Sequence, residues 1–393
     1  MNFLSLAQIC EINPAKAINL PDHSEISFVP MECVSADGHV DLSRTIEITR
    51  IKNYSVFKDG DILFAKITPC MENGKGAIVN GLKNGYGAGS TEFIVLRPNK
   101  NLVSAKWVYL FLSQAHFRFE CQQNMTGSAG QKRVPPKYLA TCLIPVPPLD
   151  EQERIVARIE ELFSQLDSGV DTLHKTKQQL VVYRQAVLKE AFGGYIDKKL
   201  IREMSSLVTS GSRGWAQYYA DTGARFIRIT DLARDGIHLK NDSIQHVVLP
   251  DKAEGKRSRL IGGDVLVSIT ADLGSIALIP DSIEEAYINQ HIAMVRFNNP
   301  AQGEFMAWYL RSEWGQKDLL KNKRGGGKLG LGLDDIRDTP VPVVSDEEAQ
   351  QIVAFIDNRL SVCDSIEQTV DAALQQSAAM RQSILKKAFE EGE

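Results

Sequence analysis

Lysine and arginine gather in a few short segments of this chain, two of them in its second half. One segment is Lys256-Arg257-Ser258-Arg259, and the other runs from Lys321 to Lys328 with three glycines inside it. Ammonium and guanidinium groups neutralise phosphate oxygens, and glycine lets the backbone come close to them. Such segments are typical of proteins that hold a nucleic-acid backbone, although a solvated loop that only aids solubility has the same composition.

The first half carries basic residues at a corresponding place. Gly130-Gln131-Lys132-Arg133 aligns with Gly327-Lys328 of the second half, which favours a shared role over chance. Arg213 in a predicted loop and Arg228 at the end of a predicted strand have the side chain that reads guanine, although Asp231 offers Arg228 an ion pair instead. The candidate nucleic-acid contacts are Arg44, Arg50, Lys52, Lys66, Gln131, Lys132, Arg133, Arg213, Arg228, Lys256, Arg257, Arg259, Lys321, Lys323, Arg324 and Lys328.

The chain lacks the common signatures of catalysis. It has no GxxxxGK[ST] phosphate loop and no Asn/Asp-Pro-Pro-aromatic motif for methyl transfer to amino groups. Pro250-Asp251 with Glu254 and Lys256 resembles a metal-dependent nuclease set, but its acids are too close in sequence to lie on adjacent strands around a metal. The seven histidines have no metal-ligand spacing. We therefore predict a binding module without catalytic residues or a metal site.

The chain also contains an internal repeat with a shift of 197 residues. Residues 130–192 align without a gap with residues 327–389, so that Arg184-Gln185 recurs as Arg381-Gln382. A repeat of this length is a duplicated module of domain plus helix, because solenoid units are only about 20–50 residues long. Two similar modules on one chain predict pseudo-two-fold symmetry.

Each copy begins with a pattern that predicts a mixed α/β domain. Short apolar, β-branched runs after turn residues predict strands, and Asp61–Ile67 matches Asp264–Ile269 in this respect. Short amphipathic helices are expected at Trp107–Leu112 and Phe305–Leu310. The loops of the two copies differ more than the long segments that follow, which indicates a shared scaffold that carries different surface loops.

Each copy ends with a long amphipathic segment that follows a proline-rich stop. Asp150 with Glu153, and Ser345 with Glu348, have the spacing of a helix capping box, and Gly193 with the next glycine ends the first helix. Apolar residues recur at steps of three and four. The predicted contacts of the helix seam and of subunit docking are Ile155, Ile159, Leu162, Leu166, Leu173, Leu180, Ile352, Ile356, Val370 and Leu374.

A helix from Asp150 to Phe192 would be about 63 Å long at ~1.5 Å per residue. Such a helix with one apolar stripe needs a partner, which the second copy supplies on the same chain. We therefore expect an antiparallel coiled coil with one globular domain at each end. The predicted fold class is α+β, with mixed α/β domains at 1–149 and 195–345 and long helices at 150–194 and 346–393.

Composition and charge set broader limits. The 393 residues are 43% hydrophobic and 24% charged, as in a globular protein of two or three domains. No apolar run reaches the ~18 residues of a membrane span, and the N-terminus does not resemble a secretory signal. The six cysteines include no CxxC pair, which predicts a reducing cytoplasm.

The net charge of −4 is unevenly distributed. Residues 150–192 hold 6 basic and 8 acidic side chains and residues 346–393 hold 4 and 10, so the globular parts are net basic. Nucleic-acid binding requires lysine and arginine only at the contact face. The distribution agrees with such contact, and an ordinary solvated surface is the alternative.

Several motifs, taken in order, resemble one protein family. Pro145–Val156, Tyr183–Gly194 and Gly60–Thr68 are similar to segments of the specificity (S) subunit of Type I restriction–modification systems. Ser212–Ala216 and Phe226–Arg228 resemble segments of its second recognition domain. The motifs are individually short, but their order and duplication are specific, and the resemblance covers nearly the whole chain.

The resemblance implies two target-recognition domains, each of which reads one half of a split double-stranded DNA site. It also implies helices that act as a ruler and dock two methyltransferase subunits, with restriction subunits joining in the restriction complex. It implies no cofactor in this chain; the methyltransferase would use S-adenosylmethionine, and the restriction subunit ATP and Mg. The second helix departs from the pattern, because it starts with Ser345–Gln350 instead of Asp-Glu-Gln-Glu-Arg.

Two other classes of function remain as alternatives. One is a coiled-coil adaptor whose domains bind protein without reading DNA. Such an adaptor would show neither co-purification with a methyltransferase nor a sequence-dependent gel shift. The other is a self-sufficient nuclease or methyltransferase, which the missing motifs disfavour and which incubation with DNA, magnesium and a methyl donor would test.

Overall fold

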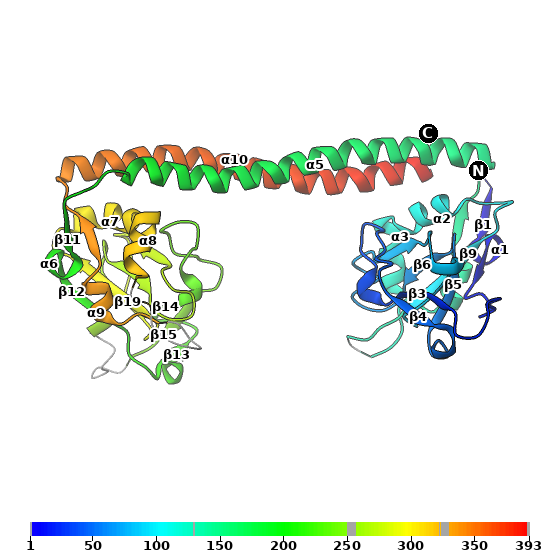
Figure 1. The fold of residues 1–393 in the computed structure, drawn as a ribbon, viewed down its shortest axis with the longest axis horizontal. Helices are drawn as coiled ribbons and strands as arrows, with labels where there is room; N and C mark the ends of the chain where they lie inside the picture. Colours follow the sequence, from blue (N-terminus) through cyan, green and yellow to red (C-terminus); the bar gives the residue numbers. More distant parts are fainter. Residues whose placement is uncertain (1, 129, 250–256, 322, 324–329, 391–393) are drawn as a thin grey trace. The chain divides into compact units, whose positions relative to one another are not determined.

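The computed structural model describes residues 2–128, 130–249, 257–321, 323 and 330–390. The chain divides into two compact units: unit 1 is Met1–Leu173 with Ala372–Glu393, and unit 2 is His174–Asp371. Each unit contains one mixed α/β domain and a stretch of both long helices, α5 (Leu149–Phe192) and α10 (Asp346–Glu390), as Figure 1 shows.

The domain of unit 1 has two four-stranded sheets. The inner sheet is antiparallel, has the order β2-β9-β6-β7 and is covered by α2 and α3; the outer sheet has the order β4-β3-β8-β5, with β3 and β8 parallel. A ribbon of β1 and β10 completes the domain. The elements are β1 Phe3–Ser5, α1 Leu6–Ile9, β2 Cys10–Ile12, β3 Glu25–Val29, β4 Thr45–Glu47, β5 Ser55–Lys58, β6 Ile62–Ala65, β7 Gly76–Ile78, β8 Tyr86–Gly89, β9 Phe93–Pro98, α2 Ala105–Leu112, α3 Ala115–Gln123, α4 Pro136–Thr141 and β10 Leu143–Pro145.

The domain of unit 2 repeats the inner sheet strand for strand, as β12-β19-β16-β17, and the ribbon as β11-β20. Its outer sheet differs: the order is β13-β15-β14-β18, so β13 is added beside β15, and among the described residues no strand pairs with β18 in the place of β5. The elements are β11 Lys198–Leu200, α6 Ile201–Met204, β12 Ser205–Ser210, β13 Tyr219–Ala220, β14 Ala224–Ile227, β15 Gln245–Val247, β16 Val265–Ser268, β17 Ile276–Leu278, β18 Ala286–Ile288, β19 Ile292–Phe297, α7 Gly303–Arg311, α8 Glu313–Leu319, α9 Leu333–Arg337 and β20 Pro340–Pro342.

The strand β6 is buried on both faces, which explains its unbroken run of apolar residues. Ile62 and Phe64 belong to the core beneath α2, whereas Leu63 and Ala65 belong to the core between the two sheets. Side chains alternate between the faces of a strand, so a strand between two layers needs apolar residues at every position. The matching strand β16 is buried in the same way.

A buried ion pair recurs in both inner sheets. Asp61 is 1% exposed and accepts two hydrogen bonds of 2.8 Å from the guanidinium of Arg97 on β9. Asp264 is 0% exposed and accepts bonds of 2.8 Å and 2.7 Å from Arg296 on β19. The aspartate of each Gly-Asp motif therefore ties the start of one central strand to its neighbour.

The start of α5 is fixed by a buried glutamine. Gln152 is 0% exposed, accepts a hydrogen bond from the backbone N–H of Ser104 and donates to the carbonyl of Leu102. The helix already includes Leu149, so the predicted capping by Asp150 is wrong. In the second copy, Ser345 accepts a bond from the N–H of Glu348, as predicted.

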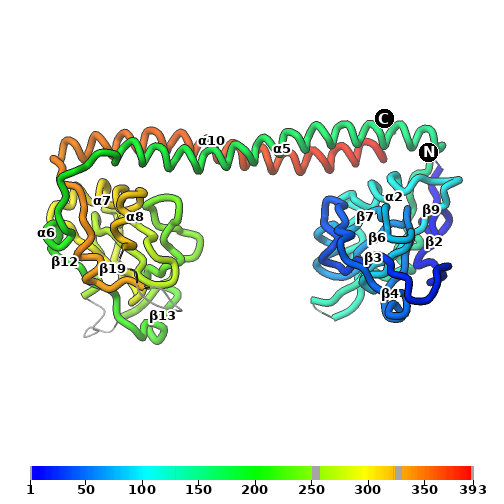
Figure 2. The backbone as a smooth tube through the Cα atoms, viewed as in Figure 1, coloured from blue at the N-terminus to red at the C-terminus, as the bar shows by residue number. Residues whose placement is uncertain are grey.

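The two long helices pair antiparallel within each unit (Figure 2). In unit 1, Asp167 of α5 pairs with Arg381 of α10 at 2.7 Å; in unit 2, Arg184 of α5 pairs with Asp364 of α10 at 2.7 Å. Residue numbers fall along α10 as they rise along α5. The shift of 197 residues converts the first pair into the second, so both copies contribute the same contact. The predicted fold class is confirmed.

The predicted seam residues are all at least partly buried. Some of them contact the domains as well as the opposite helix: Ile155 and Ile159 pack in the core of unit 1, and Ile356 packs in the core of unit 2. Ile155, Ile159, Leu180, Ile356 and Val370 are buried, and Leu162, Leu166, Leu173, Ile352 and Leu374 are partly buried.

Neither a membrane span nor a disulfide occurs in the part of the chain that the structure describes. None of its helices is both long and apolar enough to cross a membrane. The six cysteines are free thiols.

Candidate nucleic-acid interface

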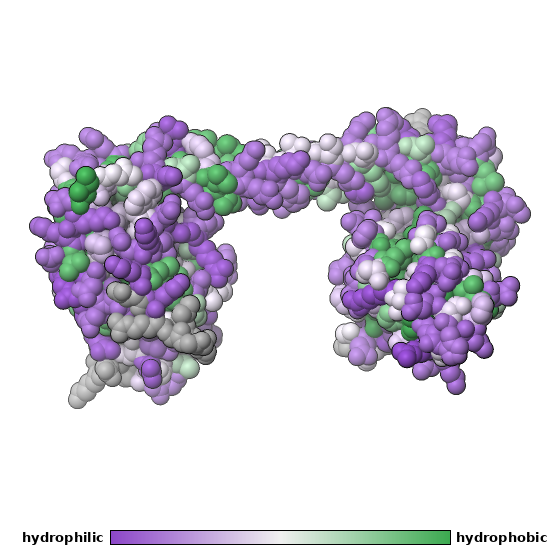
Figure 3. Space-filling view, in the orientation of Figure 1, coloured by the Kyte–Doolittle hydropathy of each residue, from purple (hydrophilic) through white to green (hydrophobic). Residues whose placement is uncertain are grey.

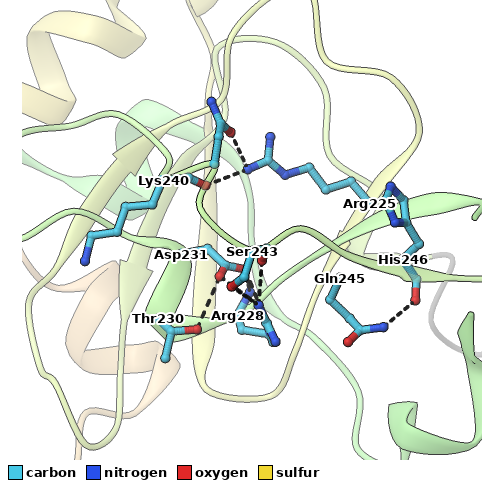
Figure 4. A network of polar contacts seen from close by, with 9 residues as sticks. Arg225, Arg228, Thr230, Asp231, Lys240, Ser243, Gln245 and His246 are labelled. Carbon is cyan, nitrogen blue, oxygen red and sulfur yellow. Dashed lines mark hydrogen bonds and ion pairs between the residues drawn. The ribbon is translucent and has the colours of Figure 1, made fainter. Parts of the chain in front are cut away.

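The outer sheet of unit 2 carries a network of polar side chains, drawn in Figure 4. Arg225 on β14 lies opposite His246 on β15. Its Nη2 donates to the backbone carbonyl of Lys240 and to Oδ1 of Asn241, both at 3.0 Å. These bonds hold one nitrogen of a half-buried guanidinium group. A guanidinium held in this way loses little entropy when it binds two acceptors of a guanine or a phosphate.

Arg228 follows β14 directly and is held from two sides (Figure 4). It forms an ion pair with Asp231, with Nη2 and Oδ1 3.2 Å apart, and donates to the carbonyl of Ser243 at 2.8 Å. The alternative of an ion pair with Asp231 is thus realised. The prediction that Arg228 reads a base stays a prediction.

Arg213 lies in a loop that an aromatic cluster fixes to the outer sheet. Trp215 is 5% exposed, and its ring centroid is 4.7 Å from that of Phe226 and 5.6 Å from that of Tyr287. Gly214, which lies between Arg213 and Trp215 in the sequence, has a φ of 82°, a backbone conformation that suits glycine. Arg213 itself is exposed, so the cluster presents a cation at the surface.

In unit 1 the fold brings Lys66 close to Lys132 and Arg133, which are neighbours in the sequence but lie far from Lys66 along the chain. The backbone N–H of Val134 donates to the carbonyl of Lys66, and that of Thr68 donates to Lys132. Lys132 is exposed, as is the neighbouring Gln131.

Arg133 does not stand free in this cluster. It pairs with Glu92 at 2.8 Å, and this hydrogen-bonded guanidinium lowers the pKa of Glu92. The local charge of unit 1 is therefore carried by the two lysines more than by Arg133.

A cleft of about 340 Å³ lies beside these lysines. Lys16 and Lys66 line it, together with Ser55 and Thr91, and the described lining includes no carboxylate. The ammonium of Lys16 donates to the carbonyl of Lys52 at 3.2 Å, which holds the two segments together. The cleft is thus a cationic depression beside the outer sheet.

The remaining predicted residues of unit 1 lie around β4. Arg44 pairs with Glu32 at 2.8 Å, and this hydrogen bond raises the pKa of Arg44. Arg50 ends a short 3-10 helix (Ile48–Arg50), and Lys52 follows two residues later; both are exposed.

The remaining predicted residues of unit 2 lie in separate places. Arg257 and Arg259 are exposed and lie just before Leu260, whose N–H donates to β18. Lys321 and Lys323 are exposed beyond the end of α8. The predicted contacts Lys256, Arg324 and Lys328 lie outside the described residues.

The structure adds residues that the sequence pattern did not reveal. Lys16 joins the cleft only through tertiary contact with Lys66 and Lys52, for which the sequence holds no signal. Arg225 lies on β14, whose burial does not alternate from residue to residue, so no periodic pattern in the sequence marks this arginine as a surface residue. On the face seen in Figure 3, hydrophilic residues make up most of each domain's surface.

The described residues contain no group of three or more His, Cys, Asp or Glu side chains that could hold a metal ion. The arrangement offers cations and hydrogen-bond donors on the outer sheets. Its chemistry is that of binding an acceptor-rich, anionic partner.

A family model, described as the Type I restriction modification DNA specificity domain, matches residues 1–181 and 194–376. The specificity subunit of the Type I restriction enzyme EcoAI from Escherichia coli is 40% identical over 205 residues, covering 51% of this chain and 34% of that protein. The EcoKI specificity subunit of Escherichia coli K12 is 24% identical over 316 residues, covering 75% and 67%. The matches to EcoAI and EcoEI thus cover about a third of those proteins' length.

Solved structures show the same fold. A chain from a study of complex assembly and conformational transition of the type I R-M system has a TM-score of 0.78 at 19% identity, covering 99% of this chain and 97% of that one. The HsdS subunit from Thermoanaerobacter tengcongensis has a TM-score of 0.57 at 19% identity, with coverage of 99% and 96%. The chain, with its two matched domains and duplicated fold, belongs to the family of Type I restriction–modification specificity subunits.

Proposed function

We propose that this chain is the DNA-recognition subunit of a Type I restriction–modification complex. Each α/β domain reads one half of a split double-stranded site, and the two long helices set the number of base pairs between the halves. The form of the duplication carries this proposal: the inner sheets, the buried ion pairs and the helix contacts repeat, whereas the outer sheets differ. Two half-sites of different sequence require two different contact surfaces on one scaffold.

The charges on the outer sheets support DNA as the partner. Unit 1 presents Lys16, Lys66 and Lys132 around one cleft and loop, and unit 2 presents Arg213 and Arg225. Lysine ammonium groups suit contacts to phosphate, which give affinity without sequence preference. The held guanidinium of Arg225 suits a base edge, which gives sequence preference.

The partners and cofactors follow from this role. The helix pairs dock two methyltransferase subunits, and restriction subunits join the complex when it cleaves. The methyltransferase subunits bring S-adenosylmethionine, and the restriction subunits bring ATP and Mg. The chain contributes recognition and no catalysis of its own. Because such a complex acts on chromosomal DNA, its place is the cytoplasm.

The test combines co-purification with DNA binding. The chain is expressed with the methyltransferase subunit encoded in the same genome. The complex is titrated with DNA that contains the site found by methylation mapping, and with random DNA of equal length. Arg225→Ala should weaken binding to the mapped site by about 10- to 100-fold, since a bidentate base contact is worth ~1–3 kcal/mol. Lys199→Ala, an exposed residue of β11 remote from the outer sheet, is the matched control and should change nothing.

The outcome separates the two functions that the sequence left open. An adaptor without DNA recognition would not co-purify with the methyltransferase and would bind both DNAs equally. Equal binding by wild type would therefore refute the proposed function. An unchanged preference in Arg225→Ala would remove only this residue from the contact list.

The role of the helices as a ruler has its own test. Two heptads inserted after Leu173 in α5 and before Ala372 in α10 lengthen each helix by about 21 Å, or roughly six base pairs. We expect a methylated site with a longer spacer, or loss of methylation. An unchanged site in long-read methylation mapping would rule out the ruler.

A further inference from the structure

One ion pair of unit 1 has no counterpart among the described residues of unit 2. Lys106 of α2 and Glu160 of α5 lie 2.6 Å apart, so the domain of unit 1 is joined to its long helix by a salt bridge. The repeat shift of 197 residues puts Asp357 of α10 at the position of Glu160. The helix of unit 2 therefore keeps the acid of this pair.

The residue that the domain contributes to this pair is basic in unit 1 and acidic in unit 2. Trp107 of α2 packs on the phenylalanine near the end of α10, and Phe305 of α7 packs on the equivalent phenylalanine of α5. Trp107 and Phe305 thus occupy equivalent places, and so do the residues that precede them, Lys106 and Glu304. Unit 2 has two carboxylates where unit 1 has a lysine and a carboxylate.

These carboxylates line a cavity of about 470 Å³ in unit 2, which we call the acidic notch; it is lined by Glu304, Asp357, His238, Trp308 and Leu360, among others. Burial, together with the charge of Asp357, raises the pKa of Glu304, and burial raises the pKa of Asp357. The nearby His238 lowers both pKa values, but by less than burial raises them. The net upward shifts show that neither acid is stabilised as strongly as a carboxylate in a close ion pair.

The cations nearby do not fill this place within the described residues. Arg184 is occupied by Asp364 at 2.7 Å and by Glu367 at 2.8 Å. Lys240 lines the notch, but it forms no ion pair with Glu304 or Asp357 in the described part of the chain. The notch thus contains two carboxylates, Glu304 and Asp357. It has open volume where a basic side chain could pair with them.

We propose that the acidic notch receives a lysine or arginine side chain from a protein subunit that docks on the helix pair of unit 2. This inference rests on the proposed function and names the chemistry of one docking site. Unit 1 shows that an ammonium group satisfies the helix carboxylate in this architecture. The aromatic and aliphatic walls of Trp308 and Leu360 suit the stem of a long basic side chain.

The two halves of the helix pair therefore offer different docking sites. In unit 1 Lys106 already pairs with the helix carboxylate, and in unit 2 the corresponding carboxylate is left for a partner's cation. A complex that contains two identical partner subunits would hold them through unequal contacts. The subunit at unit 2 would bind with the stronger dependence on salt.

The test fills the notch from within. Glu304→Lys recreates the salt bridge of unit 1, Glu304→Gln removes the charge alone, and Lys106→Gln is the matched control in unit 1. Affinities for the co-expressed methyltransferase subunit are measured by calorimetry at low and high salt. We expect Glu304→Lys to weaken binding at unit 2 by about 10-fold and Glu304→Gln by about 3-fold, with Lys106→Gln within 2-fold.

A second measurement makes the result independent of the partner. Glu304→Lys should raise the unfolding midpoint of the isolated chain, because it joins the domain of unit 2 to its helix; an unchanged or lower midpoint overturns the inference. Unchanged partner affinity in Glu304→Lys also overturns it while the proposed function stands. A wild-type chain that binds no methyltransferase contradicts the proposed function itself. Saturation of the notch by Mg²⁺ or spermidine alone would identify a small cation as the occupant and refute a docking role.

Discussion

Replacing Asp61 by asparagine should destabilise unit 1 while leaving its shape intact. Asp61 is 1% exposed and Arg97 is 24% exposed, and two hydrogen bonds of 2.8 Å join them. Removing one partner of a fully buried pair costs about 3–5 kcal/mol, because the other charge stays buried without compensation. Water reaches part of Arg97, and asparagine keeps one acceptor. We therefore expect a loss of about 2–3 kcal/mol in the free energy of unfolding.

Urea denaturation with hydrogen exchange of the β6 and β9 amides measures this loss and locates it. Glu11→Gln is the control, because Glu11 approaches Arg97 only to 3.8 Å and is 58% exposed; its effect should stay below about 0.5 kcal/mol. Asp264→Asn should give a similar loss in β16 and β19 of unit 2. A loss below 0.5 kcal/mol in Asp61→Asn, or lost protection in unit 2 rather than unit 1, would refute the assignment of this pair as structural.

Three further perturbations test other features. Gly169→Ala in α5 should raise the unfolding free energy by about 0.5–1 kcal/mol in urea titrations, because a Cβ there meets open space; a loss would contradict this. Glu304→Gln should leave the unfolding free energy equal to that of wild type near pH 4 and raise it at pH 7. The pKa of Glu304 is raised in the native state, so the wild-type protein loses stability as pH rises above the ordinary carboxyl pKa, and glutamine removes this loss. A difference between the two proteins that does not depend on pH would contradict this. Lys132→Ala should reduce the slope of log affinity against log salt by about 0.9 in DNA titrations, with exposed Lys100→Ala as the unchanged control; equal slopes would exclude phosphate contact.

The long helices and their pairing could be predicted from the sequence, because the signal is local and occurs twice. Steps of three and four between apolar residues predict each helix, and the gap-free repeat fixes which residues are equivalent. Glycine 193 marks the end of α5 at Phe192. The capping-box spacing points to a helix that starts at Asp150, whereas α5 begins at Leu149 and is anchored by the buried Gln152.

The inner sheets could also be predicted in part. The run from Ile62 to Ala65 reads as a strand buried on both faces, and the Gly-Asp motif precedes it in both copies. The role of its aspartate could not be read, because Arg97 is remote in sequence and becomes its partner only in the folded sheet.

The outer sheets and their cations were the least predictable part. The sequence shows where the basic residues are but not which acids they pair with: Arg133 pairs with Glu92, and Arg44 pairs with Glu32. The cleft of Lys16 depends on contacts between distant segments. Arg225 is not among the predicted contacts, because a strand as short as β14 shows no alternating burial that would mark a surface residue.

Methylation mapping with exchanged halves tests the central claim most directly. Residues 195–345 are replaced by the corresponding segment of a relative with a different site, and the genome is mapped by long-read sequencing beside wild type and a deletion strain. We expect a two-part methylated site in wild type that disappears in the deletion strain. In the exchange strain, one half of the site should change while the other half and the spacer length stay the same. The same methylated site in all three strains, or an exchange that alters both halves, would contradict the account.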